Sequence, residues 1–188
     1  TSRIAQSIDM TMEGDDLFAQ AKQRLMAYGA LVGKPAEAAA LAAELDAALS
    51  STRAAVKGKG TALILMTSGP KVTAYGKTSR FGWLHSALQL TPTVEDVEAA
   101  THGEAISFEF LRDANPDWLI VLDRGAAIGS GEQNARATLD NELAAETTAW
   151  KKGQVVYMPA ADFYIAAGGV QSTMRVLEAI RDAFSQTK

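Results

Sequence analysis

The sequence has 188 residues, a formal net charge of −4 at pH 7 and no cysteine, and 47% of its residues are hydrophobic. The lack of cysteine excludes disulfides, thiolate metal sites and a cysteine nucleophile, and the acidic balance argues against a protein that binds nucleic acid. No run of about 18 apolar residues predicts a membrane-spanning helix, and the length fits one sizeable domain.

The N-terminal part is predicted to be helical as far as about Lys57. Apolar residues recur at helical spacing after Asp16, at Leu17, Ala21, Leu25 and Tyr28. The segment Gly33 to Pro35 separates this helix from a second, alanine-rich helix, which ends before Gly58. We therefore interpret residues 1–57 as a helical segment and residues 58–188 as a separate α/β unit.

From residue 61 onward, short apolar runs alternate with helical patterns. The runs at 62–66, 118–122 and 155–158 are bounded by glycine or proline, and 72–75 is a candidate for a further short strand. Continuous apolar runs of this length are typical of strands buried on both faces of a parallel sheet. Helices are expected at 79–89, 106–114, 134–150 and 170–185. The alternation predicts an α/β fold, with a mostly parallel sheet flanked by helices.

Ligands of open parallel sheets bind at the carboxyl ends of the strands, so the residues there form the candidate site. They are Thr67 to Pro70 after the first run, Asp123 and Arg124 after the second, and a loop with Asp162, Phe163 and Tyr164 after the third. No Walker loop, zinc-binding His-Glu-x-x-His pattern or nucleophile elbow is present. A small α/β enzyme that uses His102 as a general base is one alternative, but no local group supplies its nucleophile or metal.

One long block carries a family resemblance, the segment 74–85 with the sequence AYGKTSRFGWLH. Shorter blocks follow in order at 101–103, 107–110, 115–124, 139–141 and 164–172. Together they resemble the siderophore-binding proteins of ABC importers, the catecholate-binding members of the helical-backbone periplasmic binding proteins. The resemblance runs from about residue 14 to the end of the chain.

The resemblance implies two α/β lobes joined by a long helix, with the ligand in the cleft between them. Residues 14–32 resemble the connecting helix and the rest resembles the C-terminal lobe, so we expect the N-terminal lobe to be absent from this chain. Because a cleft normally buries its ligand on both sides, we expect this chain alone to bind weakly or undetectably.

The resemblance also implies a role for five residues. Arg80 and Arg124 match anion-binding arginines, and a guanidinium suits a strongly negative ferric catecholate because it is permanently charged and gives paired hydrogen bonds to oxygen. His102 and Tyr164 match iron ligands that fill the two positions left free when a siderophore supplies four oxygens. Glu109 matches an acidic surface residue that docks on the permease.

The expected function is to bind a ferric siderophore and deliver it to an ABC permease and its ATPase, without catalysis or nucleic-acid binding. Ferric iron would enter only as part of the ligand, with no intrinsic cofactor. The protein is expected to be a monomer in the periplasm, or anchored by lipid to the outer face of the cytoplasmic membrane. A haem- or cobalamin-binding protein of the same fold is the second alternative.

Overall fold

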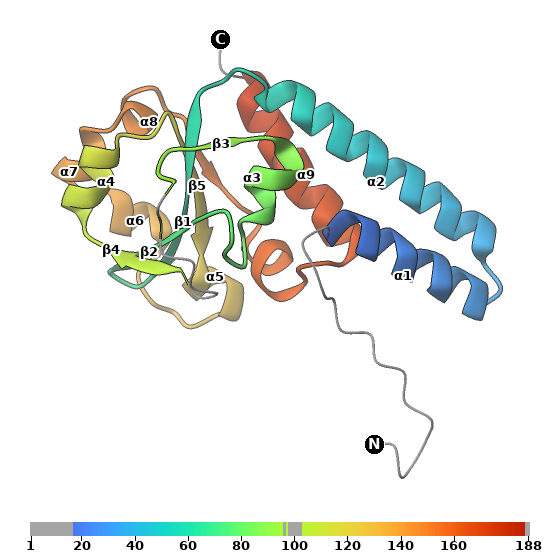
Figure 1. Ribbon diagram of the computed structural model, residues 1–188. Coiled ribbons are helices and arrows are strands. Elements are labelled where there is room, and N and C mark those ends of the chain that lie inside the picture. The colour runs from blue at the N-terminus through green and yellow to red at the C-terminus, as the bar shows by residue number, and fades with distance from the viewer. Residues whose placement is uncertain (1–16, 96, 98–102, 187–188) are drawn as a thin grey trace.

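The computed structural model describes residues 17–95, 97 and 103–186. Its centre is a mixed sheet in the order β4-β2-β1-β5-β6, with β3 beside the start of β1 (Figure 1). The strands are β1 Thr61–Ser68, β2 Lys71–Tyr75, β3 Thr91–Pro92, β4 Glu104–Ile106, β5 Trp118–Asp123 and β6 Val155–Tyr157. The pairs of β1 with β3 and β5, and of β5 with β6, are parallel. The predicted α/β fold with a mostly parallel sheet is therefore confirmed.

The antiparallel part of the sheet comes from one tight hairpin. Ser68 pairs with Lys71, so only Gly69 and Pro70 connect β1 to β2. Gly69 has a φ of +54°, a conformation that such two-residue turns favour at glycine. The turn reverses the chain at the carboxyl end of β1, and β2 then pairs antiparallel with both β1 and β4.

Helices cover both faces of the sheet. They are α1 Leu17–Leu31, α2 Pro35–Val56, α3 Trp83–Leu88, α4 Phe108–Ala114, α5 Arg124–Ile128, α6 Ala135–Leu139, α7 Glu142–Ala145, α8 Thr148–Lys151, a π-helical turn η1 Ala161–Ile165, and α9 Val170–Gln186. Ile64 and Ile120 face the core under α2, α3 and α9, whereas Leu63 and Leu119 face the core under α4, α6 and α7. This alternation explains the continuous apolar runs, because the apolar residues of β1 and β5 meet a packed layer on either face.

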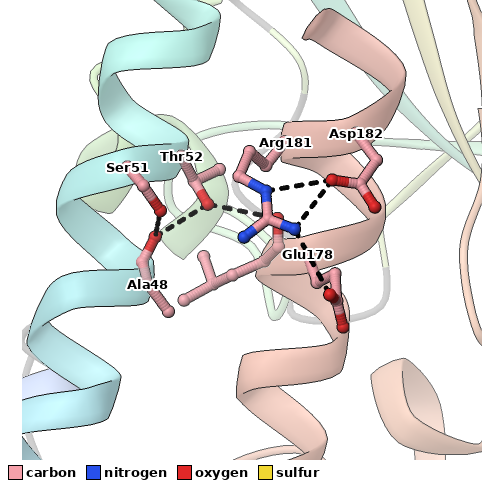
Figure 2. A network of polar contacts seen from close by, with 7 residues as sticks. Ala48, Ser51, Thr52, Glu178, Arg181 and Asp182 are labelled. Atoms are coloured by element: carbon pink, nitrogen blue, oxygen red, sulfur yellow. Dashed lines mark hydrogen bonds and ion pairs between the residues drawn. The ribbon is translucent and has the colours of Figure 1, made fainter.

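The N-terminal helices pack directly on the last one (Figure 1). Figure 2 shows the polar network at this contact, where the buried Thr52 hydroxyl shares its one proton between the carbonyl oxygens of Ala48 at 2.8 Å and Leu177 at 3.1 Å. Beside it, Arg181 pairs with Glu178 and Asp182 on the same turn of α9. Thr52 thus joins α2 to α9 without leaving its own hydroxyl unpaired. None of the helices that the structure describes is long and apolar enough to cross a membrane.

The prediction of a single helix at 134–150 was wrong. The segment forms three short helices, because Asn134, Asn141 and Thr147 each cap a new one. Their side-chain oxygens accept hydrogen bonds from the backbone N–H groups three residues later. Asparagine and threonine compete in this way with a continuing helix and favour a fresh N-terminus. The helix expected at 79–89 is also shorter, since residues 77–82 form turns and a bend before Trp83.

Candidate ligand-binding site

The candidate site lies at the carboxyl ends of β1 and β5. Here Asp123 positions the starts of the two helices that follow β5. Its carboxylate accepts hydrogen bonds from the backbone N–H of Ala126 and of Ala135, both at 2.8 Å. The first bond caps α5, and the second holds the start of α6. The backbone at Arg124, the first residue of α5, is therefore held in place by both hydrogen bonds of its neighbour Asp123.

Arg124 reaches from this position to two hydroxyl groups. Its Nε lies 3.4 Å from the Tyr164 hydroxyl, and its Nη1 lies 3.5 Å from the Ser68 hydroxyl. The Ser68 hydroxyl in turn lies 3.4 Å from the Glu132 carboxylate. The hydrogen bond to Tyr164 raises the pKa of the Arg124 guanidinium, which stays charged. All three contacts are at the long limit for hydrogen bonds, so a ligand oxygen could replace them at small cost.

Arg80 approaches the same tyrosine from the segment between β2 and α3. Its Nη2 donates to the backbone oxygen of Tyr164 at 2.5 Å. Its Cζ lies 4.6 Å from the centre of the Tyr164 ring and 5.3 Å from that of Phe81. The Arg80 side chain is exposed and the Tyr164 side chain half-buried. The structure therefore brings Arg80, Arg124 and Tyr164 together, although three separate segments carry them.

A second tyrosine, Tyr75, belongs to this group and was not predicted. It is 3% exposed, and its hydroxyl lies 3.6 Å from the sulfur of Met66. Burial raises the pKa of Tyr75, and the neighbouring Tyr164 raises it further, while Arg80 and Arg124 act in the opposite direction. The sequence offered one signal, an amphipathic aromatic residue at the end of a strand, but strand residues of this kind most often only pack.

Next to Arg80, an apolar cavity of about 170 Å³ lies beneath α1. Phe18, Trp83 and Phe163 are among its lining residues, together with Asp162. Arg175 holds the Asp162 carboxylate with two hydrogen bonds of 2.8 and 2.6 Å, and these lower the pKa of Asp162.

The remaining predicted residues lie elsewhere. Glu109 is exposed in the first turn of α4, on the opposite face of the sheet from α9 and Phe163. Its own backbone N–H, followed by the Ser107 hydroxyl, lowers the pKa of its carboxyl group, so it carries a negative charge. His102, proposed as an iron ligand or a base, falls outside the described residues. The other histidine, His85, is buried with its Nδ1 3.0 Å from the Leu90 oxygen, which is a structural arrangement.

Comparison with known proteins places these features in context. Residues 5–161 match the family model described as "Periplasmic binding protein". The petrobactin-binding protein YclQ of Bacillus subtilis is 27% identical over 186 residues, which are 98% of this chain and 58% of that protein. The chain thus spans little more than half the length of this curated relative.

Solved structures agree with the fold. A TroA-like periplasmic binding protein of Xylanimonas cellulosilytica superimposes with a TM-score of 0.90 at 36% identity, covering 97% of this chain and 63% of the other. The periplasmic catecholate-siderophore binding protein VctP of Vibrio cholerae gives a TM-score of 0.86 at 31% identity, covering 96% and 66%.

Proposed function

The chain belongs to the periplasmic binding protein family, and from this premise we propose that it is the part of a solute-binding protein that captures a ferric siderophore of the catecholate type. It delivers the complex to an ABC permease and its ATPase, and it acts by binding, without catalysis. Two of the similar proteins are named for petrobactin and for catecholate siderophores, which supports this ligand class.

The observation that carries the proposal is the convergence of Arg80 and Arg124 on Tyr164. Two permanent positive charges beside a half-buried phenol form a surface for a ligand rich in negatively charged oxygen. The Arg124 guanidinium contacts hydroxyl groups, and neither guanidinium forms an ion pair among the described residues. Both charges therefore remain available to an anionic ligand.

Iron enters the proposal as cargo within the siderophore. Tyr164 and His102 are proposed to supply the two ligands that a tetradentate siderophore leaves open. Ferric iron is a hard cation that favours phenolate oxygen and accepts imidazole. Arg124 and Arg80 support this role for Tyr164, because both guanidinium groups contact it and would face the negatively charged oxygens of the complex there.

Glu109 is proposed as a docking residue for the permease. Its exposure and its negative charge support an ionic contact with arginines of a membrane partner. The protein is proposed to work as a monomer in the periplasm or from a lipid anchor on the outer face of the cytoplasmic membrane.

A fluorescence titration tests the proposed ligand, with Trp83 beside the site as the reporter. Ferric catecholate, haem and cobalamin are compared on the chain and on a longer version that adds the expected N-terminal lobe. We expect weak or undetectable quenching on the chain alone. On the longer version we expect saturable quenching by the ferric catecholate, which the double change Arg80→Gln, Arg124→Gln abolishes. Binding of haem or cobalamin instead, or ferric catecholate binding that ignores both arginines, would overturn the assignment.

A further inference from the structure

The cavity beneath α1, called here the α1 chamber, has the size of a single aromatic ring. It is a partly open pocket, lined by Phe18 and Ala21 of α1, Trp83 of α3, Phe163 of η1 and Val176 of α9 among others. Its volume is about 170 Å³. An engineered apolar cavity of about 150 Å³ in another protein stays free of water and binds benzene. A six-membered ring therefore fits the α1 chamber by volume.

The lining of the chamber is largely aromatic, which suits an aromatic ring better than water. Phe18 and Trp83 meet edge to face with ring centres 5.5 Å apart, and Trp83 meets Phe163 at 6.2 Å. Phe163 in turn packs against Phe81, which also lines the chamber, at 4.7 Å. Rings at these angles leave edges and faces for one more ring to join the cluster.

Only one charge on the chamber lining lacks a counter-charge among the described residues. Asp162 also lines the chamber, but Arg175 neutralises it through two short hydrogen bonds. Arg80 uses Nη2 for the backbone oxygen of Tyr164, and no other hydrogen bond of its guanidinium occurs within the described part of the chain. The chamber thus combines an apolar interior with a free positive charge at Arg80.

We propose that the α1 chamber is a subsite for an aryl group that carries an anionic oxygen. The ring enters between Phe18, Trp83 and Phe163, and the oxygen binds the Arg80 guanidinium. Resting on the proposed function, the group is one aryl arm of the siderophore, whose oxygens meet Arg80 beside Tyr164. The subsite would select siderophores with aromatic arms over those with purely aliphatic ones.

Small probes test the subsite without iron. Benzoate and benzene are titrated by ligand-observed NMR against the chain and three variants. Ala21→Leu fills the chamber, Arg80→Met removes the charge, and Ala27→Leu makes the same exchange at an exposed position of α1. We expect Ala21→Leu to abolish binding of both probes and Ala27→Leu to leave it unchanged. Arg80→Met should weaken benzoate about tenfold or more and leave benzene unaffected.

The subsite is overturned if neither probe binds the unaltered chain, if Ala21→Leu binds both normally, or if Arg80→Met does not discriminate between them. Circular dichroism of each variant shows that the fold is kept. Titration with a ferric siderophore separates the two proposals. Probe binding by the chain, without siderophore binding by the longer version that adds the expected N-terminal lobe, supports the subsite and contradicts the siderophore assignment. Full siderophore affinity in Ala21→Leu supports the assignment and contradicts the role of the subsite in it.

Discussion

The Arg124 guanidinium lies 3.4 Å from the Tyr164 hydroxyl, although 40 residues of sequence separate the two. Arg124 begins α5 directly after β5, and Tyr164 lies on the π-helical turn that follows β6. The parallel pairing of β5 with β6 puts the ends of both strands at one edge of the sheet. A fixed positive charge therefore stands beside the oxygen that is proposed to bind iron.

Replacing Arg124 by glutamine should weaken binding of a ferric catecholate about tenfold to a hundredfold, the usual effect of losing a charge-assisted hydrogen bond. Arg124→Lys should recover only part of the affinity, since an ammonium cannot form the paired contacts of a guanidinium. Titrations at low and high salt measure the affinity of each variant for the ferric catecholate. Equal affinity for the unaltered protein and Arg124→Gln at low salt would show that Arg124 does not touch the ligand.

Asp123 should be more important for stability than an ordinary helix cap. Asp123→Ala removes hydrogen bonds from the starts of both α5 and α6, and we expect a loss of about 1–3 kcal/mol in the free energy of unfolding. Asn134→Ala is the matched control, because Asn134 caps α6 with a single bond to Ala137. Urea unfolding measures the free energy of unfolding of both variants and of the unaltered protein. A smaller loss for Asp123→Ala than for Asn134→Ala would contradict the double role.

Acid should destabilise the protein through His85. Burial lowers the pKa of His85 below the ordinary histidine value of 6.5, so the unfolded chain binds a proton more readily than the folded one. The contribution to stability is complete above about pH 6.5 and is lost as the pH falls through the lowered folded-state pKa. His85→Asn keeps a donor for the Leu90 oxygen but does not titrate there. Urea unfolding at pH 7.5 and 5 should show a smaller change in the free energy of unfolding for this variant than for the unaltered protein. An equal change in both would show that His85 does not cause the loss of stability in acid.

Charge reversal at Glu109 should separate delivery from binding. We expect Glu109→Lys to bind the ferric siderophore normally but to lose most of its stimulation of the transporter ATPase in membrane vesicles, because like charges would meet at the docking surface. Glu44→Lys on the exposed face of α2 is the matched control and should behave like the unaltered protein. A normal response of Glu109→Lys would place the docking surface elsewhere.

Much of the fold could be predicted because its central strands are buried on both faces. The apolar runs at 62–66 and 118–122 became β1 and β5 for that reason, and the run at 155–158 became the partly buried edge strand β6. The division of 134–150 into three helices depended on local capping, which helical periodicity does not register. The proposed boundary between residues 57 and 58 stays a prediction.

The site residues that could be predicted lie at strand ends or in the segments that resemble the family. Arg124 follows a strand directly, and Arg80 lies in the longest block of resemblance. Tyr75 was missed, because an aromatic strand residue most often only packs. The α1 chamber could not be predicted, because it arises when Phe18, Trp83 and Phe163 come together from distant segments. The metal role of His102 stays a prediction, since this residue lies outside the described part of the chain.

The most direct test of iron ligation compares a tetradentate with a hexadentate ferric catecholate on the unaltered protein, Tyr164→Phe and His102→Ala. The chain and the longer version with the expected N-terminal lobe are titrated side by side, and the visible charge-transfer band of each complex is recorded. We predict that both variants lose about tenfold or more in affinity for the tetradentate complex, change its band, and bind the hexadentate complex normally, because its iron has no free position. Unchanged affinity and an unchanged band for the tetradentate complex in Tyr164→Phe would contradict the account.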